Sequence, residues 1–452
     1  MLKNERKVIT YGTFDQFHIG HRKLLENAKS YGDHLIVGIT TTEFDVQRGK
    51  LNVVDSLMER IDNVRMSGLA DEIIIETHEG QKIDDIQKQG VDIFVVGSDW
   101  RGYFDYLKEY CKVVYVERTK DISSSDLRNE KNGIIKLGMV GTGRIAVRTM
   151  YELKYVSGVV ASAVYNPRKS SALGFALENN IPQCFNDYGQ FLSAVDAVYV
   201  ASPHGSHYQY AKEALLCGKH VFCEKPMVLC KSEAKELFLL AEQYNLVLME
   251  ALKTAYAPGF LNLISVAKSG RIGGIRDVEA TFTKLISNSS NAREYDKDVG
   301  GSFTELASYS LLPIIKLLGI NYEKVRFDCF NDENGVDIYA KAYFNYGDSV
   351  ATAKTGIGVK SEGQLLISGT KGYILVRSPW WITKSFEVCY ENPHDNESFS
   401  ASFPGYGIRF GIADFVSNIN NPTQRNYKLS RGNSIALAAM MEQFMIYRKR
   451  KV

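Results

Sequence analysis

Two histidines, His18 and His21, lie three residues apart in the stretch GTFDQFHIGH, between an apolar run and a helical one. Residues at i and i+3 share one side of a helical turn, so the two imidazoles can reach the same phosphate oxygens. Gly12 and Gly20 let the backbone approach closely at this turn, and a helix start offers unpaired N–H groups to an anion. The spacing therefore indicates a phosphate site, although a pair of surface histidines on a loop fits the spacing equally well.

A second glycine-rich turn, GMVGTGRIA, carries Gly141, Gly143 and Ala146 after an apolar run and ahead of a helical one. A GxGxxA pattern in this context is typical of a site for the pyrophosphate of a dinucleotide. The acidic residue expected at the end of the next strand is replaced by Asn166, with Arg168 close behind it. A neutral residue beside a cation tolerates a 2′-phosphate, which favours NADP while leaving NAD open.

The elements that must position these turns follow from the hydrophobic pattern. Short β-branched runs such as KVITYG and HLIVGIT alternate with amphipathic runs through the first 120 or so residues, which predicts a parallel sheet with helices on both faces. The same pattern restarts at IIKLGMVG and ends near residue 255. From residue 256 onward consecutive alternating strands predict an open, mostly antiparallel sheet. We therefore predict an α/β chain with three domains, at residues 1–130, 131–255 and 256–452.

Composition excludes several classes of function. The 452 residues carry a formal net charge of +2, and only the C-terminal YRKRKV is a basic run, so nothing favours binding to nucleic acid or to a membrane surface. The seven cysteines show no CxxC spacing, so we expect free thiols in a reducing compartment and no metal held by the protein. No 18 apolar residues run together and no signal segment opens the chain, which predicts a soluble, cytoplasmic protein.

Residues 6 to about 128 resemble the cytidylyltransferase branch of the nucleotidyltransferase superfamily, most closely the glycerol-3-phosphate cytidylyltransferases. Three ordered motifs carry the resemblance: GTFDQFHIGH, VVGSDW and RTKDISSS. The resemblance implies a Rossmann-like fold that binds CTP with Mg²⁺ and assigns His18 and His21 to catalysis, as an acceptor phosphate attacks the α-phosphorus and pyrophosphate leaves. CTP contacts besides the histidines are assigned to Gly12, Thr13, Phe14, Asp99, Trp100, Arg118, Thr119, Ile122, Ser123 and Ser124.

The chain departs from this family where the acceptor should bind. Arg48 and Lys50 follow the segment EFDVQ, where the family places a lysine, and Gly68 stands at the position of a family arginine. Lys82 lies beside the position of a further acceptor lysine. We predict that Arg48, Lys50 and Lys82 bind the acceptor phosphate. The departures open the acceptor site to a polyol phosphate other than glycerol 3-phosphate.

From residue 135 to the C-terminus the chain resembles the Gfo/Idh/MocA oxidoreductases, on the motifs GTGRIA, ASPHGSHY, GKHVFCEKP and GGSFTELASYSL. The resemblance implies a Rossmann domain followed by an α+β domain for substrate binding and oligomerisation. It places Lys225 beside the reacting carbon, and it places Glu305 and Tyr309 at the carboxylate and proton-transfer positions, although Tyr309 could instead pack in the sheet. Cofactor contacts are assigned to Gly141, Thr142, Gly143, Arg144, Ile145, Asn166, Arg168, Ser202, Pro203, His207, Glu224 and Lys225, with His207 as a support of the cofactor loop.

Two catalytic units on one chain indicate consecutive steps. We hypothesise that the second half reduces a sugar phosphate with NADP(H) or NAD(H), and that the first half couples the alditol phosphate to CTP, giving a CDP-alditol for cell-surface polysaccharide. Two alternatives stay open: the oxidoreductase acts on a CDP-linked product, or it is a cofactor-binding module without turnover beside a glycerol-3-phosphate cytidylyltransferase. Both resemblances also imply self-association as a dimer or tetramer, with only small molecules as substrates.

Overall fold

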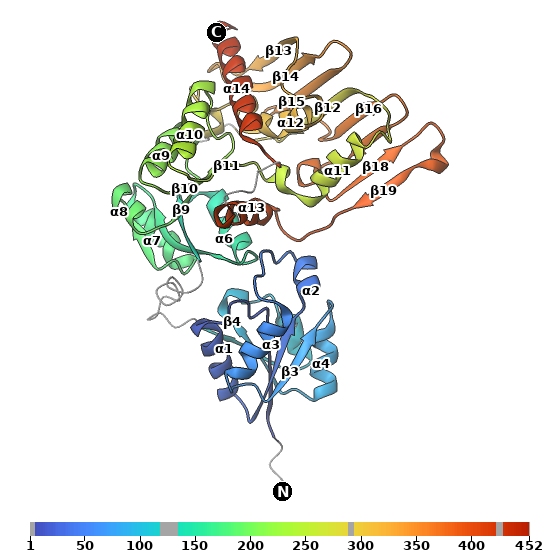
Figure 1. Ribbon diagram of the computed structural model, residues 1–452. Helices are drawn as coiled ribbons and strands as arrows, with labels where there is room; N and C mark the ends of the chain where they lie inside the picture. Colours follow the sequence, from blue (N-terminus) through green and yellow to red (C-terminus); the bar gives the residue numbers. More distant parts are fainter. Residues whose placement is uncertain (1–4, 118–133, 288–292, 422–427, 452) are drawn as a thin grey trace. The chain divides into compact units, whose positions relative to one another are not determined.

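The structure is a computed structural model that describes residues 5–117, 134–287, 293–421 and 428–451 (Figure 1). This part of the chain divides into two compact units, of which the first contains one sheet and the second contains two. The predicted α/β class is confirmed, because two parallel sheets are followed by a mostly antiparallel one. The predicted boundary at residue 130 lies outside the described residues, and the boundary at 255 stays a prediction.

The first unit is built on five parallel strands in the order β3-β2-β1-β4-β5. The strands are β1 (Lys7–Gly12), β2 (His34–Thr40), β3 (Glu72–Glu76), β4 (Ile93–Gly97) and β5 (Lys112–Val116). The helices are α1 (Ile19–Ser30), α2 (Thr42–Gln47), α3 (Leu57–Met66) and α4 (Gln81–Gln89), with 3-10 turns η1 (Ser98–Trp100) and η2 (Asp105–Glu109). Because the strand order reverses beside β1, ligands are expected at the carboxyl ends of β1 and β4.

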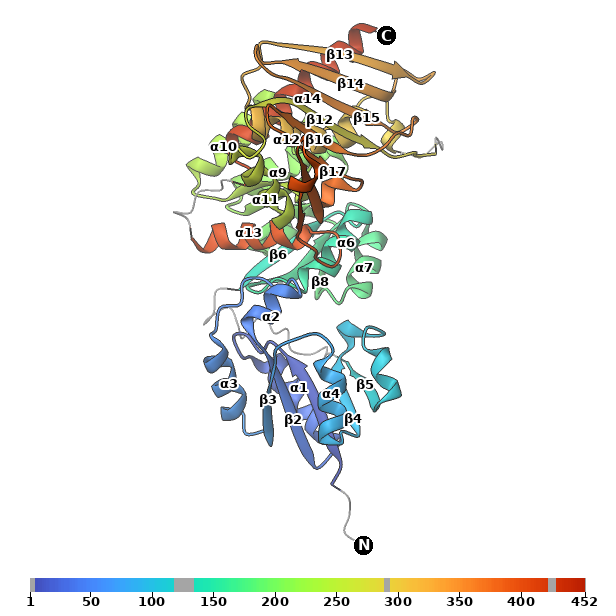
Figure 2. The ribbon, with the colours of Figure 1, turned by 90° about the vertical axis from the view of Figure 1, so that its right-hand side faces the viewer.

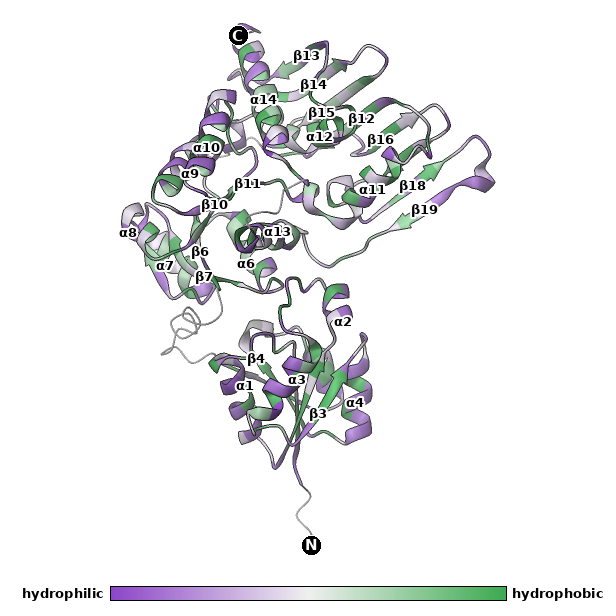
Figure 3. Ribbon diagram, viewed as in Figure 1, coloured by the Kyte–Doolittle hydropathy of each residue, from purple (hydrophilic) through white to green (hydrophobic). Residues whose placement is uncertain are grey.

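The alternation of β1 explains why both faces of this sheet are covered. Val8 packs with residues of α1 and α3, whereas its neighbour Ile9 packs with residues of α4 and η2. Successive side chains of a strand point to opposite faces, so an all-apolar strand needs helices on both sides. In Figure 3, α1 and α4 carry both hydrophobic and hydrophilic residues, as helices with one buried side do.

The second unit begins with a six-stranded sheet in the order β11-β10-β9-β6-β7-β8, again with its order reversed beside β6. The strands are β6 (Ile135–Val140), β7 (Val159–Tyr165), β8 (Gln183–Phe185), β9 (Ala197–Val200), β10 (His220–Glu224) and β11 (Leu248–Ala251). Its helices and turns are α6 (Arg144–Leu153), α7 (Lys169–Glu178), α8 (Tyr188–Ser193), η3 (His204–Ser206), α9 (His207–Leu216), α10 (Lys231–Gln243) and η4 (Lys253–Tyr256).

The third sheet has eight strands in the order β13-β14-β15-β12-β16-β17-β18-β19, antiparallel except for the pair β12–β15. The strands are β12 (Ile275–Thr283), β13 (Lys324–Asn331), β14 (Asp337–Asn345), β15 (Val350–Gly356), β16 (Leu365–Gly369), β17 (Tyr373–Val376), β18 (Ser385–Cys389) and β19 (Glu397–Ser400). Its helices and turns are α11 (Pro258–Lys268), η5 (Arg293–Tyr295), α12 (Ser302–Leu318), η6 (Trp380–Ile382), η7 (Pro393–Asp395), α13 (Ile408–Asn420) and α14 (Arg431–Lys451).

Helix α12 is fixed at its start by a buried polar network. The carboxylate of Asp337 accepts hydrogen bonds from the backbone N–H of Phe303 at 2.8 Å and from the hydroxyl of Ser302 at 2.9 Å. The guanidinium of Arg448 reaches the same carboxylate at 2.9 Å. Phe303 is fully buried and stacks on Phe444 of α14 with ring centroids 4.1 Å apart. Burial of a phenylalanine contributes about 1.5–3 kcal/mol, so polar and apolar contacts both hold this helix in place.

Helix α13 carries the chain from the third sheet back to the second. Its Phe415 stacks on Phe222 of β10 with ring centroids 5.3 Å apart. Helix α13 contacts α6 and the strands β10 and β11, and Figure 2 shows it along this part of the dinucleotide fold. Residues of α13, near the C-terminus, therefore pack against the dinucleotide fold.

Candidate active sites

The first predicted turn folds as a capped helix start. His18 is the N-cap of α1, and its Nδ1 accepts the backbone N–H groups of Gly20 at 3.0 Å and His21 at 3.3 Å. A neutral ring that accepts at Nδ1 carries its proton on Nε2, so it can donate there. The rings of His18 and His21 stack with centroids 3.7 Å apart. The structure therefore brings the two imidazoles together at the N-terminus of α1, where an anion is favoured.

The backbone of this turn is shaped by close packing. Phe14 has a positive φ of 53° and is buried, and its ring lies edge-on to His21 with centroids 5.4 Å apart. A Cβ at Gly12 would come within 3.1 Å of the Phe14 ring. Glycine at position 12 therefore lets the chain fold back over itself before α1. Thr13, between them, donates its hydroxyl to Asp45 at 3.0 Å.

The other predicted CTP contacts are described only in part. Trp100 ends η1, directly after β4, and its ring packs against Tyr103 and Phe104 with centroids 5.4 and 5.9 Å apart. Trp100 thus follows β4, the strand next to β1, and its contact with CTP stays a prediction. The side chain of Asp99 and the whole segment with Arg118, Thr119, Ile122, Ser123 and Ser124 lie outside the described residues.

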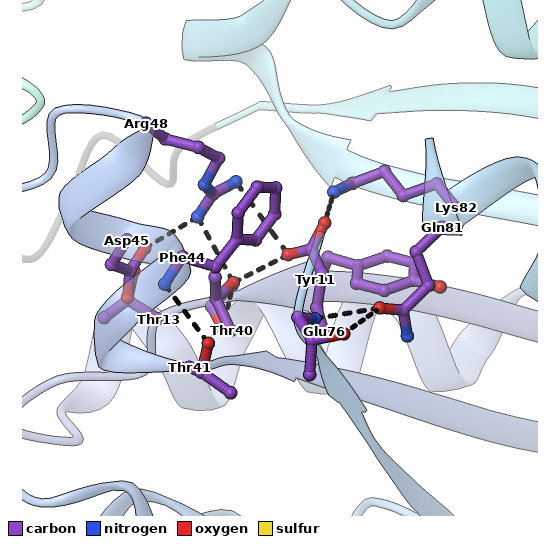
Figure 4. Close-up of polar contacts among 12 residues, drawn as sticks. Tyr11, Thr13, Thr40, Thr41, Phe44, Asp45, Arg48, Glu76, Gln81 and Lys82 are labelled. Carbon is purple, nitrogen blue, oxygen red and sulfur yellow. Dashed lines mark hydrogen bonds and ion pairs between the residues drawn. The ribbon is translucent and has the colours of Figure 1, made fainter. Parts of the chain in front are cut away.

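Two of the three predicted acceptor cations meet at one carboxylate (Figure 4). Glu76 ends β3, and its carboxylate pairs with Lys82 of α4 and lies 3.9 Å from a guanidinium nitrogen of Arg48. Arg48 also donates to Asp45 at 2.7 Å and to the hydroxyl of Thr40 at 3.2 Å. Asp45, Arg48, Glu76 and Lys82 form what we name the acceptor network.

Burial and charge oppose each other in the acceptor network. Burial raises the pKa of Asp45, against the effect of Arg48, and burial lowers the pKa of Lys82, against the effect of Glu76. Lys82 also lies over the ring of Tyr11, with Nζ 4.5 Å from the centroid. Lys50 is not part of the acceptor network. Burial lowers its pKa, and the charges of Asp45 and Asp15 oppose this shift.

The sequence prediction missed Arg60, which is fully buried on α3. Its guanidinium donates to the carbonyl oxygens of Thr13 at 2.9 Å and Thr40 at 2.7 Å, and to the hydroxyl of Thr42 at 2.9 Å. Arg60 thus ties the loop after β1 to the loop after β2. The sequence contained a signal for this burial. Arg60 stands four residues before Val64, so the two side chains lie on the same, buried side of α3.

The second glycine-rich turn lies at the carboxyl end of β6. Gly141 has φ +103°, and a Cβ there would come within 2.8 Å of the carbonyl oxygen of Ala201. Asn166, at the end of β7, donates to the hydroxyl of Thr142 at 2.9 Å and accepts the backbone N–H of Arg168 at 2.9 Å. These contacts form a cradle in which backbone N–H groups at the start of α6 suit a pyrophosphate.

The remaining predicted cofactor residues surround this cradle. Gly143, Arg144 and Ile145 open α6, and Arg144 lies 3.7 Å from Glu294. His207 is fully buried, with Nε2 at 2.8 Å from the carbonyl oxygen of Ser202 and Nδ1 at 2.9 Å from that of Pro226. His207 therefore links the loop after β9, which includes Pro203, to the loop after β10, as a supporting residue would.

The predicted catalytic residues of the second unit lie together. Lys225 donates from Nζ to the main-chain carbonyl oxygen of Glu305 at 2.8 Å, and the same Nζ lies 5.4 Å from the ring centroid of Tyr309. Glu305 and Tyr309 stand one turn apart on α12. Burial, and next the charge of Glu224, raise the pKa of Tyr309, so the phenol is neutral and able to donate a proton. Glu224 itself accepts a hydrogen bond from the hydroxyl of Tyr199.

His204 also belongs to this cluster, although no role was predicted for it. Its Nδ1 lies 3.6 Å from a carboxylate oxygen of Glu305, and both side chains are about nine-tenths buried. Burial, and next the charge of Lys225, hold the pKa of His204 well below its ordinary value. The neutral ring therefore lies beside the Glu305 carboxylate without adding a full positive charge to it.

The chain is similar to known proteins in two separate parts. Residues 9–130 match the family described as cytidylyltransferase-like, and residues 135–252 match the oxidoreductase family with an NAD-binding Rossmann fold. The glycerol-3-phosphate cytidylyltransferase of Bacillus spizizenii is 50% identical over 125 residues, which are 28% of this chain and 96% of that protein. The trans-1,2-dihydrobenzene-1,2-diol dehydrogenase of Xenopus laevis is 28% identical over 321 residues, which are 68% of this chain and 96% of that protein.

A solved structure supports the fold of the second unit. The 3-ketoreductase of Actinomadura kijaniata in complex with NADP and TDP-benzene matches with a TM-score of 0.60 and 21% identity, over 68% of this chain and 96% of that one. At this identity the likeness shows the fold alone. In the part of the chain that the structure describes, no helix has the length and apolar character needed to span a membrane.

Proposed function

Because the chain joins a member of the cytidylyltransferase-like family to a member of the Gfo/Idh/MocA oxidoreductase family, we propose that it is a bifunctional enzyme that makes a CDP-alditol. The second unit reduces a keto or aldehydo sugar phosphate with NADPH or NADH. The first unit then transfers the cytidylyl group of CTP to the alditol phosphate and releases pyrophosphate. The product is an activated donor for cell-surface polysaccharide. The observation that carries this proposal is that each unit brings together side chains predicted for its own reaction: His18 and His21 in the first unit, and Lys225, Glu305 and Tyr309 in the second.

Cytidylyl transfer rests on positioning and charge. A phosphate oxygen of the alditol phosphate attacks the α-phosphorus of CTP, and the bond to the pyrophosphate oxygen breaks. His18 and His21 donate hydrogen bonds to the phosphate oxygens on which charge develops. Arg48 and Lys82, held by Glu76, attract the acceptor phosphate. Magnesium bound to the triphosphate would offset part of its charge.

Reduction rests on a neutral phenol beside an ammonium. The nicotinamide cofactor supplies the hydride when it is bound. Tyr309 donates its proton to the carbonyl oxygen, which becomes the new hydroxyl. The Lys225 ammonium, 5.4 Å from the Tyr309 ring centroid, stabilises the negative charge that develops on that oxygen. The neighbouring Glu305 and His204 orient the substrate hydroxyls.

The cradle at Gly141 suits a dinucleotide. A Cβ at position 141 would come within 2.8 Å of the carbonyl oxygen of Ala201, so glycine is what lets this turn lie close against the loop after β9. We propose NADP as the preferred form because Asn166 replaces an acidic residue at the end of β7 and Arg168 follows it. NADP is also present in the 3-ketoreductase structure. We further propose that the chain forms a dimer or tetramer, which light scattering would measure.

The test is an incubation of the full chain with CTP, Mg²⁺ and a panel of ketose and aldose phosphates, with and without NADPH. Mass spectrometry should detect a CDP-alditol only when NADPH is present. Supplying the alditol phosphate directly should remove the need for NADPH. Formation of the same CDP product from the ketose phosphate without reductant would overturn the coupled reaction. NADPH consumption only after a CDP-sugar has formed would reverse the order of steps.

A further inference from the structure

A group of cations in the second unit is not used by either proposed reaction. Arg148 lies on α6, one turn beyond the dinucleotide cradle, and Lys253 opens η4 directly after β11. Both face one aromatic ring: the Cζ of Arg148 lies 4.5 Å and the Nζ of Lys253 lies 5.9 Å from the ring centroid of Tyr406. Three segments far apart in sequence therefore bring two cations together.

The ring between the two cations is firmly placed. The backbone N–H of Tyr406 donates to Glu152 of α6 at 2.7 Å, and Glu152 also pairs with the buried Arg409 of α13 at 2.6 Å. Gly405 takes a positive φ of 79°, which lets the chain turn tightly against Glu152. The loop before α13 is thus tied to α6, and Figure 1 shows these two helices next to each other.

The carboxylates around these cations are already engaged. Glu152 is paired with Arg409, and Glu224 accepts the Tyr199 hydroxyl. Within the described residues, no carboxylate lies at ion-pair distance from Arg148 or Lys253. The Tyr406 ring attracts both cations, but it carries no charge to neutralise them. Two like charges held at 4.5 and 5.9 Å from the centroid of one aromatic ring suit an anionic ligand.

The cations also lie close to the reacting groups. Burial lowers the pKa of Lys253; the charge of Glu224 opposes this shift, and the charges of Arg148 and Lys225 add to it. Burial and the charge of Glu224 raise the pKa of Tyr309, and the charge of Arg148 opposes that rise. Lys284, directly after β12, adds a third positive charge; burial lowers its pKa, and the charges of Arg144 and Arg148 act in the same direction. An anion held by Arg148 and Lys253 would therefore lie close enough to Lys225 and Tyr309 for their charges to interact.

We propose that Arg148 and Lys253 form the subsite that binds the phosphate of the sugar phosphate during reduction. This inference rests on the proposed function and adds the residues that select a phosphorylated substrate. The phosphates of the cofactor are the other source of the same chemistry. The cofactor phosphates fit Arg148 and Lys253 less well. The cradle for the pyrophosphate begins at Gly141, after β6, and the proposed site for the 2′-phosphate, at Asn166 and Arg168, follows the neighbouring strand β7. Lys253 follows β11, the edge strand on the opposite side.

The experiment compares Lys253→Met and Arg148→Met with the wild type in the full chain. Each variant should raise the KM for a ketose phosphate about tenfold to a hundredfold, with a smaller change in kcat, since each loses a charge-assisted hydrogen bond. The affinity for NADPH, measured by its fluorescence, should stay unchanged. Lys253→Arg should recover most of the loss. Lys235→Met, an exposed lysine of α10, is the matched control and should behave as wild type.

Inorganic phosphate provides a readout that does not need turnover. Calorimetric titration of the NADPH-loaded chain should show phosphate binding in the wild type and a weaker signal in Lys253→Met. If no sugar phosphate is reduced but this difference is seen, the proposed function fails and the subsite stands. If ketose phosphates are reduced with the same KM by all variants, the function stands and the subsite is wrong. Weaker NADPH binding with an unchanged substrate KM would assign the cations to the cofactor instead.

Discussion

The ammonium of Lys225 donates a hydrogen bond of 2.8 Å to the main-chain carbonyl oxygen of Glu305, 80 residues further along the chain. This bond ties the loop after β10 to the first turn of α12. Tyr309 stands one turn later on the same helix, with its ring centroid 5.4 Å from the same ammonium. The dinucleotide fold and the helix of the antiparallel domain therefore each supply one half of the proposed reducing site.

Removing either half should stop the reduction and spare the transfer. Lys225→Ala and Tyr309→Phe should each lower NADPH oxidation by about a hundredfold to ten-thousandfold, because each loses a group that stabilises or protonates the oxygen. Pyrophosphate release from CTP and an alditol phosphate should stay at the wild-type rate. Tyr244→Phe, an exposed phenol at the end of α10, serves as the control. Full reductase activity in both variants would favour a cofactor-binding module without turnover.

The paired histidines should govern the other reaction. His21→Ala and His18→Ala should each lower pyrophosphate release roughly a hundredfold or more, the scale for one lost donor to a transition state. NADPH oxidation with a sugar phosphate should not change. His78→Ala removes an exposed histidine of the same unit and should have no effect. A His21→Ala enzyme as fast as the wild type would show that the stacked pair is structural.

The acceptor network predicts a strong coupling between Glu76 and Lys82. Glu76→Gln leaves a buried ammonium without its counter-charge, which should cost about 3–5 kcal/mol and lower the melting temperature of the first unit by roughly 10 °C or more. In calorimetry, the unfolding transition of the first unit is the one whose midpoint temperature rises when CTP is added. The double variant Glu76→Gln/Lys82→Met should regain part of the stability. If the loss of stability in the double variant equals the sum of the losses in Glu76→Gln and Lys82→Met, the two residues are not coupled.

Lys253 predicts a pH dependence of substrate binding. Burial lowers its pKa to about 8, with Arg148 and Lys225 acting in the same direction and Glu224 and Glu152 opposing them. Lys253 is therefore positively charged below about pH 8 and loses its proton above it. Because the neutral amine attracts a phosphate less strongly, the KM for a ketose phosphate should rise between pH 7 and 9. Initial rates across this range test the trend. Lys253→Arg should give a flat profile, and a slope that survives in this variant would assign the titration to another group.

Glu250 predicts a pH dependence of stability. Burial raises its pKa to about 7, from 4.5 in an exposed carboxyl. The folded chain thus keeps this proton where the unfolded chain releases it, and the free energy of unfolding falls by on the order of 3 kcal/mol as pH rises from about 4.5 to 7.

Glu250→Gln keeps an oxygen for the backbone N–H of Met227, which Glu250 accepts at 3.1 Å. Above pH 7 the variant should be more stable than the wild type, and it should lose this part of the pH slope. Thermal unfolding at several pH values, followed in the transition that NADPH raises, measures the effect. Equal slopes in the two proteins would show that another group titrates.

Local patterns were sufficient for the elements that hold the two glycine-rich turns. The runs KVITYG and HLIVGIT form β1 and β2, and the restart at IIKLGMVG forms β6. Helix α12 was not recognised as a helix from GGSFTELASYSLLPIIK. It contains Pro313 and is apolar on nearly all sides, so it lacks both the periodicity and the composition of a surface helix. Its burial between the third sheet and α14 is what makes it stable.

The sequence by itself determined the two kinds of chemistry, because a histidine pair before a helix and a glycine turn after a strand act through neighbours in the chain. Contacts between distant segments were decided only by the tertiary structure. The sharing of Glu76 by Arg48 and Lys82, the bond from Lys225 to Glu305, and the two cations at Tyr406 each join segments whose spacing in sequence carries no signal. Burial then set the charges of these groups, since a pKa depends on the solvent and the partners that the fold leaves around each side chain.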